Sequence, residues 1–495
     1  MRECGILLPV TSIPSPYGIG GFSKEAYEFV DRLEAAGQRY WQVLPFGPTG
    51  YGDSPYQSFS AFAGNPYFID LDTLAEEGLL TEEECLEADC GQNPRYVDYE
   101  RIYKTRFQVL RKAFNRWKAL GQKSGEKLEQ ETKEYCVYMA VKNQFQGKSW
   151  AQWEEDIRLR KPETVKAWEE ELADEILFYE FQQLKFQEQW KKLKDYANSR
   201  GVRIIGDIPI YVAFDSADSW FHPELFQFNE DREPDFVAGC PPDGFSPTGQ
   251  LWGNPLYRWD YHKKTGYAWW IRRMAYCFRL YDVVRVDHFR GFDEYFSIPA
   301  DAADATLGHW EKGPGIQLFQ AVRSALGEKE IIAEDLGYVT DSVRQLVKDS
   351  GYPGMKVLEF AFDSRDSGCA SDYLPHNYPE NSVVYTGTHD NETITGWYQS
   401  IRPEERLLAR DYLCDHYTPV GKLHLSFISL AMRSSARMCI IPIQDYLGLD
   451  NTARINTPST VGTNWKWRLT KDQLSPKLIE QIGNITLRYG RWNWT

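Results

Sequence analysis

The stretch Tyr281-Asp-Val-Val-Arg-Val-Asp-His-Phe-Arg-Gly291 carries the pattern from which the rest of the chain can be interpreted. Its centre, residues 283–288, predicts a buried β-strand, because valine suits a pleated and mostly buried surface. Side chains of a strand alternate between its faces, so Arg285 and Asp287 should project the same way. A cation beside a carboxylate lowers the pKa of that carboxylate. The stretch therefore predicts an ionised Asp287 at a strand end, either as a functional group or as half of a structural ion pair.

Apolar segments of this kind recur along the chain, mostly separated by patterns of helical spacing. They are centred near residues 6, 41, 204, 284, 332, 357, 384 and 440. Alternating strands and helices imply a parallel sheet. Eight such units predict one catalytic (β/α)₈ TIM barrel over residues 1–495. Little sequence follows the eighth unit, so no C-terminal β-domain is expected.

Two long segments interrupt this alternation and predict insertions between strands. Residues of about 74–200 mix charged and apolar side chains at helical spacing, which predicts a helical insertion subdomain. Residues of about 212–266 are rich in Gly, Pro, Trp and Phe, and predict an irregular insertion with an active-site lid loop. The Gly- and Pro-rich segment 47–66 predicts a functional loop, since long irregular loops in compact domains usually bind or catalyse.

Composition restricts the classes of partner. The 495 residues carry 71 acidic and 56 basic side chains, a net charge of −15, which argues against a general nucleic-acid binder. Nine cysteines, an odd number without a C-x-x-C pair, predict reduced thiols in a cytoplasmic protein. The N-terminus has no signal pattern and no apolar run approaches a membrane span, so no membrane partner is expected.

Three carboxylates follow predicted strands: Asp287, Glu334 and Asp390. Barrel active sites lie at the carboxyl ends of strands. Two carboxylates on either side of a glycosidic bond are the usual apparatus of glycoside chemistry. Asp287 suits the ionised nucleophile, and Glu334, leaving an apolar strand, suits an acid of raised pKa. Asp390 with His389 would bind sugar hydroxyls. Metal binding is the competing use, disfavoured because no paired-His spacing accompanies these acids.

Several motifs together resemble the 4-α-glucanotransferases, also called amylomaltases or disproportionating enzymes, of the α-amylase-like clan of retaining barrel enzymes. The resemblance covers nearly the whole chain. Its motifs are Val286-Asp-His-Phe-Arg-Gly291, Ala333-Glu-Asp-Leu-Gly337, Thr388-His-Asp-Asn391, Gly50-Tyr-Gly-Asp-Ser-Pro-Tyr-Gln-Ser58, Gly206-Asp-Ile-Pro209, Trp252-Gly-Asn-Pro255 and Asn464-Trp465.

This resemblance implies a role for each acid: Asp287 as nucleophile, Glu334 as general acid/base and Asp390 as transition-state stabiliser. It implies glucan contacts, including a lid over the acceptor, from Arg285, His389, Asp207, Ser54, Tyr56, Trp252, Tyr51, Asn464, Asp243 and Phe245. It also implies that no cofactor is needed, and no metal is expected. The implied donors and acceptors are α-1,4-glucans, namely maltooligosaccharides, amylose and glycogen.

The expected reaction is transfer of a glucan segment through a covalent glycosyl-enzyme intermediate. Two alternatives stay open at this point. An α-1,4-glucan hydrolase of the amylase type would use the same acids but would accumulate reducing ends. A non-catalytic glucan-binding protein would have no need of all three acids.

Overall fold

The chain folds around a closed barrel of eight parallel strands. The computed structural model describes residues 2–50, 52–88, 90–91, 93–121, 127–242, 246–337, 339–363 and 370–494. The barrel strands are β1 (Glu3–Leu7), β2 (Tyr40–Gln42), β3 (Arg203–Ile208), β6 (Val283–Val286), β9 (Ile331–Ala333), β10 (Gly354–Val357), β11 (Ser382–Tyr385) and β12 (Met438–Pro442). They follow one another around the barrel in chain order, and β1 pairs with β12 to close it. Each of the eight predicted strands is thereby confirmed, and so is the TIM barrel.

Alternation along the strands sorts side chains between the barrel interior and the surrounding helices. Val283 lies in a cluster with inward residues of the other strands, such as Ile205, Ile332 and Tyr385. Val284 belongs instead to the large outer core beneath the helices. Since Arg285 lies two residues beyond Val283, its side chain enters the barrel as well.

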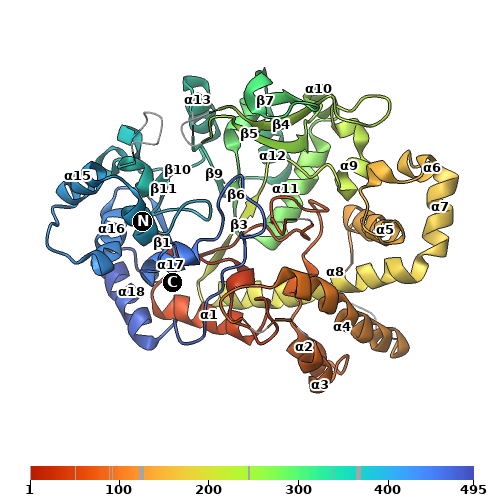
Figure 1. Ribbon diagram of the computed structural model, residues 1–495, viewed down its shortest axis with the longest axis horizontal. Coiled ribbons are helices and arrows are strands. Elements are labelled where there is room, and N and C mark those ends of the chain that lie inside the picture. The colour runs from red at the N-terminus through yellow and green to blue at the C-terminus, as the bar shows by residue number, and fades with distance from the viewer. Residues whose placement is uncertain are drawn as a thin grey trace.

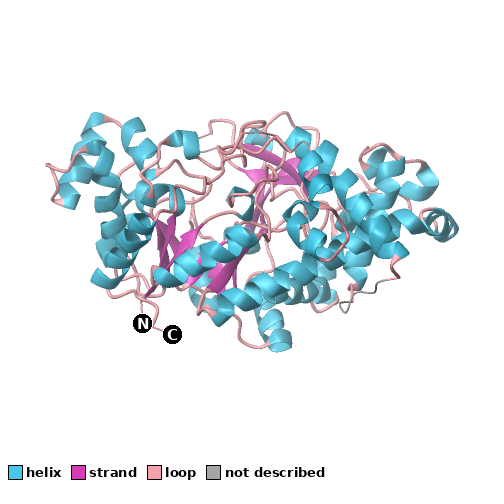
Figure 2. Ribbon diagram, turned by 90° about the horizontal axis from the view of Figure 1, so that it is seen from below, coloured by secondary structure: helices cyan, strands magenta, loops and turns pink. Residues whose placement is uncertain are grey.

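Helices surround the barrel (Figure 2) and extend it to one side (Figure 1). They are α1 (Lys24–Ala35), α2 (Leu71–Glu76), α3 (Glu82–Glu87), α4 (Tyr99–Ala119), α5 (Gln130–Gln144), α6 (Glu155–Arg158), α7 (Pro162–Glu171), α8 (Ala173–Ser199), α9 (Ala217–Phe221), α10 (Trp259–Lys264), α11 (Ala268–Leu280), α12 (Ile316–Leu326), α13 (Asp341–Ser350), α14 (Ile394–Ser400), α15 (Pro403–Leu413), α16 (Leu423–Arg433), α17 (Ile443–Tyr446) and α18 (Pro476–Arg488).

The segment between β2 and β3 holds helices α2 to α8, at the right and lower right of Figure 1. Helix α8 belongs to both parts of the molecule. Near its start, Tyr179 packs against Tyr135 of α5. Farther along, Trp190 packs against Phe46 after β2 and donates a hydrogen bond to the carbonyl of Leu280. The helix therefore begins in the extension and ends as the barrel helix that precedes β3.

Four strands form a separate antiparallel sheet above the barrel in Figure 1, in the order β5-β4-β7-β8. They are β4 (Phe236–Cys240), β5 (Gln250–Pro255), β7 (Glu294–Pro299) and β8 (His309–Lys312). The sequence predicted residues 212–266 to be irregular, and the structure corrects this for β4 and β5. The pairing of β4 with β5 shifts register between Val237 and Gly239, so neither strand shows a regular alternation in sequence.

The eight cysteines among the described residues are free thiols, as predicted. Within the same described ranges, no helix is both long and apolar enough to cross a membrane.

Candidate active site

The three acids predicted from sequence lie just beyond the carboxyl ends of β6, β9 and β11. Val286 pairs with Ala333, so Asp287 and Glu334 are the next residues of two adjacent strands. The backbone N–H of Glu334 donates to the carbonyl of Val286 at 3.1 Å. Asp390 follows β11 by five residues, on a turn closed by hydrogen bonds from Thr388 to the side chain of Asn391. One end of the barrel thus carries all three carboxylates.

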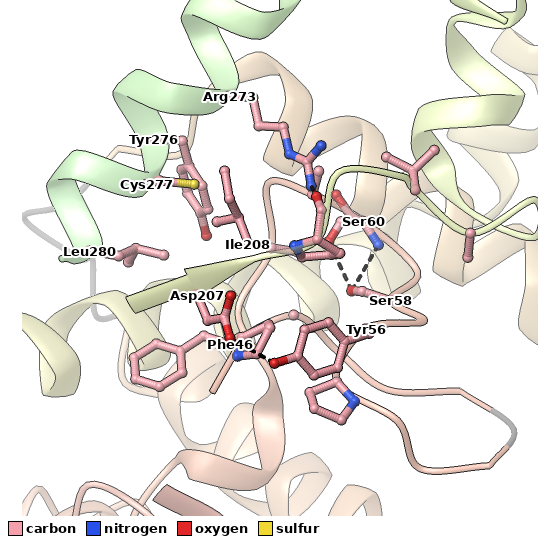
Figure 3. A pocket seen from close by; sticks show the side chains of 18 of the residues that line it. Phe46, Tyr56, Ser58, Ser60, Asp207, Ile208, Arg273, Tyr276, Cys277 and Leu280 are labelled. Carbon is pink, nitrogen blue, oxygen red and sulfur yellow. Dashed lines mark hydrogen bonds between the residues drawn. The ribbon is translucent and has the colours of Figure 1, made fainter. Parts of the chain in front are cut away.

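Asp287 is held by a chain of buried polar groups. Arg285 contacts Asp287 Oδ1 through Nη1 at 3.0 Å, which confirms that the two side chains share a face. The same nitrogen contacts both oxygens of Asp207 at 2.7 Å. Asp207 also accepts a 2.7 Å hydrogen bond from the hydroxyl of Tyr56, and Figure 3 shows these two side chains pointing at one another. One guanidinium therefore serves two carboxylates.

Burial reverses the shift that was expected for the pKa of the nucleophile candidate, Asp287. Burial raises the pKa of Asp287 to about 6, Arg285 opposes that rise, and the charges of Asp207 and Asp390 add to it. Sequence reasoning predicted a lowered pKa because it considered Arg285 alone. Asp287 is still ionised at neutral pH, with its side chain 25% exposed toward the mouth of the barrel.

Glu334 is fixed by two backbone donors. The N–H of His288 donates to Oε2 at 2.6 Å, and the N–H of Leu336 donates to Oε1 at 3.0 Å. His288 reaches this position in the left-handed conformation, with φ of 51°. Burial raises the pKa of Glu334 to about 8, and the charge of Asp287 adds to the rise. The raised pKa agrees with the sequence expectation, and it leaves Glu334 mostly protonated at neutral pH.

Asp390 is kept ionised by its neighbours. Burial acts against its charge, but His389 and a hydrogen bond from Asn456 outweigh burial and hold the pKa below its usual range. His389 Nε2 lies 3.2 Å from Oδ2, and Asn456 Nδ2 lies 2.6 Å from Oδ1. The ring of Tyr56 stacks on His389, with centroids 5.1 Å apart. Tyr56 thus contacts both the His389–Asp390 pair and the chain of polar groups formed by Asp207, Arg285 and Asp287.

Three other predicted residues occupy different parts of the site. Trp252, on β5 of the antiparallel sheet, packs edge-to-face against the imidazole of His288, with centroids 4.9 Å apart. The hydroxyl of Ser54 accepts from the N–H of Tyr56 within its own loop. The side chain of Asn464 bonds only to Thr457 and Thr460 among the described residues. Asn464 therefore closes the loop beside Asn456, and the direct glucan contact predicted for it stays a prediction. Tyr51, Asp243 and Phe245 lie outside the described residues.

Sequence reasoning missed two residues that hold Asp390. Asn456 bonds its carboxylate, and Arg454 donates to its backbone carbonyl at 2.7 Å. Both come from the polar stretch that follows α17, about 65 residues after Asp390, and belong to no strand. No motif or periodicity marks them, so only spatial proximity reveals them.

The three acids are partly exposed to solvent, whereas the side chains of Arg285, His389 and Asp207 that hold them are buried. The side chain of Asp390 is 42% exposed, whereas those of Arg285 and His389 are 3% and 1% exposed. Asp207 has no exposed side-chain surface. The glucan contact predicted for Asp207 stays a prediction. Both of its carboxylate oxygens are bonded to Arg285 or Tyr56, which favours an action of Asp207 through Arg285.

Replacing Asp207 by Asn should mainly destabilise the fold. Loss of one partner leaves the Arg285 charge poorly compensated in a buried site, which typically costs about 3–5 kcal/mol. We expect the urea midpoint to fall accordingly, while KM for maltotriose stays within about threefold of the parent value. Asp195→Asn is the matched control, since its pair with Lys191 is 63% exposed on both sides and should contribute less than about 1 kcal/mol. A large rise in KM at unchanged stability would contradict the assignment and support a direct glucan contact.

A cavity of about 50 Å³ lies behind this chain of polar groups, between β3, α11 and the loop after β2. Figure 3 shows part of its lining, with Tyr276, Cys277 and Leu280 of α11 on the side of β3 that Ile208 faces, and Asp207 on the other side, toward Tyr56. The buried hydroxyl of Tyr276 has no hydrogen-bond partner among the described residues. The volume holds a few water molecules but not a sugar ring. This cavity is therefore too small to be the glucan-binding site.

The fold and the site together define a class, namely the (β/α)₈-barrel enzymes whose carboxylates act on glycosidic bonds. A family model described as 4-alpha-glucanotransferase matches residues 8–474, and the chain belongs to this family of glycosyl-transferring enzymes. The 4-alpha-glucanotransferase of Streptococcus pneumoniae is 47% identical over 501 residues, which cover 99% of this chain and 98% of that protein. The 4-alpha-glucanotransferase of Thermus thermophilus is 45% identical over 489 residues, 96% of each.

A solved structure shows the same architecture. The amylomaltase from Streptococcus agalactiae in complex with acarbose superposes with a TM-score of 0.94 at 38% identity, and the match covers 100% of both chains. The family and the barrel that the sequence motifs implied are thereby confirmed.

Proposed function

We propose that this chain transfers α-1,4-glucan segments between maltooligosaccharides, amylose or glycogen by a retaining double displacement. The observation that carries the proposal is the placement of Asp287 and Glu334 at the ends of adjacent strands. Their pKa values of about 6 and about 8 favour an ionised nucleophile beside a protonated donor. A nucleophile beside a proton donor is what cleavage with retention requires.

In the first step, an oxygen of Asp287 attacks the anomeric carbon of the donor glucan. The bond from that carbon to the leaving 4-oxygen breaks, and Glu334 gives its proton to this oxygen. A glycosyl ester of Asp287 and a shortened glucan result. Asp390, whose pKa lies below its usual range, supplies negative charge near the oxocarbenium-like transition state.

In the second step, the 4-hydroxyl of an acceptor glucan attacks the same carbon. Its proton passes to the Glu334 carboxylate, and the ester bond to Asp287 breaks. The new α-1,4 bond replaces an equivalent one, so no energy source is required. Transfer in place of hydrolysis requires that an acceptor, and not water, occupy the site. Trp252 at the edge of the site is suited to bind the apolar face of an acceptor sugar.

The two acids predict a bell-shaped pH profile for kcat/KM. Activity needs Asp287 ionised, so it should fall as pH drops below about 6. It also needs Glu334 protonated, so it should fall as pH rises above about 8. Because the two carboxyls interact, both limits belong to the pair. Initial rates with maltotriose from pH 4 to 10 would measure this, and a rate that keeps rising beyond pH 9 would contradict the acid role of Glu334.

Product analysis with maltotriose tests the function itself. We expect a ladder of longer maltooligosaccharides together with glucose, and no net gain in reducing ends, since each cleaved bond is remade. Steadily increasing reducing ends with only maltose and glucose would favour the hydrolase. Binding of maltotriose without any product would favour a non-catalytic glucan-binding protein.

Three further expectations remain proposals. The chain acts as one catalytic barrel, with the helical segment of about 74–200 and the segment of about 212–266 as insertions, the second bearing a lid over the acceptor. A cytoplasmic location is favoured by the free cysteine thiols. The glucan contacts predicted above are proposed from the family resemblance, namely those of Arg285, His389, Asp207, Ser54, Tyr56, Trp252, Tyr51, Asp243, Phe245 and Asn464.

A further inference from the structure

Glu359 is a buried acid that the reaction proposed above does not use. It lies in a single 3₁₀ turn, Leu358–Ala361, that directly follows β10, at the same end of the barrel as the catalytic acids. The residue is 3% exposed, and its Oε1 has no hydrogen-bond partner among the described residues. A buried polar atom without a partner is costly, and such atoms concentrate at functional sites.

The charges around Glu359 favour its neutral form. Burial raises the pKa of this carboxyl well above its usual range, and three acids nearby, Asp445, Glu392 and Asp363, raise it further. Arg454 is the cation that opposes them. Burial and these neighbouring acids thus favour the neutral form of Glu359, and its shape and contacts are what the structure offers for a role.

Those contacts reach the turn that carries Asp390. The N–H of Glu359 donates to the carbonyl of Thr386 at 3.3 Å. The next residue, Gly387, has no side chain, and the Glu359 carboxyl occupies the space beside it. A Cβ at position 387 would lie 2.7 Å from Glu359 Oε1, and 3.2 Å from both the Asn391 Cβ and the Glu392 carbonyl oxygen.

Two other elements hold the same turn from different sides. Asp445 of α17 accepts hydrogen bonds from the hydroxyl of Thr386 and, at 2.8 Å, from the N–H of Ile394. Arg454 donates to the carbonyl of Asp390 at 2.7 Å. Glu359 completes this support from the β10 side. Unlike the other two, it supports the turn by filling space and not by a side-chain hydrogen bond.

We propose that Glu359 is a positioning residue for the reaction, whose carboxyl packs against Gly387 and so fixes the turn that places Asp390 and His389 beside the reacting sugar. This inference rests on the proposed role of Asp390. A shift of about 1 Å in a catalytic group can reduce turnover about 100-fold. Loss of this packing should therefore lower kcat with little effect on KM.

Four variants assayed with maltotriose test the proposal. Glu359→Gln keeps the shape without the acid and should keep kcat within about threefold of the parent. Glu359→Ala removes the packing and should lower kcat about 10- to 100-fold, with KM within about threefold. Gly387→Ala should have a similar effect, because the new Cβ displaces the carboxyl. The double variant Glu359→Ala/Gly387→Ala should recover part of the lost kcat, since the Cβ then fills space that the carboxyl has left.

Controls separate positioning from a general loss of fold. Gly421→Ala places its Cβ where nothing lies within 4 Å, and should leave kcat unchanged. If Glu359→Ala does not fold, Glu359→Asp carries the test, because it withdraws the carboxyl from Gly387 and opens a smaller cavity; its kcat should fall, and a parental kcat would overturn the inference. Asp390→Asn is assayed in parallel, and full activity in that variant would instead reject the proposed role of Asp390.

Several results would overturn the inference while leaving the role of Asp390 intact. The first is that Asp390→Asn is inactive while Glu359→Ala and Gly387→Ala both keep the parental kcat. A fall in the thermal stability of these two variants would not change that conclusion. Another is a double variant whose loss equals the product of the two single losses, which would show that the residues do not act through one contact. A large loss in Glu359→Gln would show that packing alone does not explain the residue.

Discussion

Replacement of Asp287 by Asn is expected to lower kcat for maltotriose disproportionation by about 10⁴-fold or more, because an amide cannot form the glycosyl ester. The side chain keeps its size, so the barrel should fold and the dissociation constant for maltotriose, measured by calorimetry, should stay within about threefold. The Asp287 carboxylate lies 3.0 Å from Nη1 of Arg285, and Glu334 follows the adjacent strand. No other carboxylate is placed to take over its role among the residues described around the barrel mouth.

The matched control for this variant is Asp282→Asn. Asp282 precedes the same strand at its amino end, where its carboxylate accepts the N–H of Ile204 at 2.8 Å. The same chemical change there should leave kcat within about threefold, since TIM-barrel chemistry lies at the other end. Retention of more than a tenth of the parental kcat in Asp287→Asn would reject the nucleophile assignment.

Replacement of Glu334 by Gln is expected to lower kcat about 10²- to 10⁴-fold, the usual contribution of a general acid or base. The pH profile should change as well. The parental rate falls as pH rises through about 8, where Glu334 loses its proton, and the variant has no proton to lose. Its low residual rate should therefore be flat across that range.

A maltosyl fluoride donor distinguishes the roles of the two acids. Fluoride leaves without a proton, so Glu334→Gln should still form the glycosyl-enzyme intermediate at a rate close to the parent, and mass spectrometry would detect the adduct on Asp287. Asp287→Asn should form no adduct.

Asp335→Asn is the control for Glu334→Gln, because Asp335 is the next residue in the chain and its carboxylate accepts the N–H of Met355 at 2.7 Å. The Asp335→Asn variant should lose stability and keep its turnover. An unreactive fluoride donor in Glu334→Gln would contradict a purely acid–base role.

The amino-acid sequence alone determined the barrel, its eight strands and the position of the three acids. Parallel strands at the centre of an α/β fold are buried on both faces, so each appears as a compact apolar run in the sequence. An acid that interrupts or ends such a run is conspicuous, and Asp287, Glu334 and Asp390 were all found in this way. The strands of the antiparallel sheet are partly exposed, as Leu251 at 41% illustrates, and their irregular register left no such pattern.

Only the tertiary structure decided how those acids are tuned and supported. Arg285 lies two residues from Asp287, but its closer partner is Asp207, 78 residues earlier. Burial, together with the charges of Asp207 and Asp390, turns a predicted fall in the pKa of Asp287 into a rise. Asn456, Arg454 and Glu359 reach the Asp390 turn from separate elements. Electrostatic and packing effects depend on distance in space, and a sequence specifies that distance only between near neighbours in the chain. The reacting groups could therefore be predicted from the sequence, whereas their pKa values and positions depend on the tertiary structure.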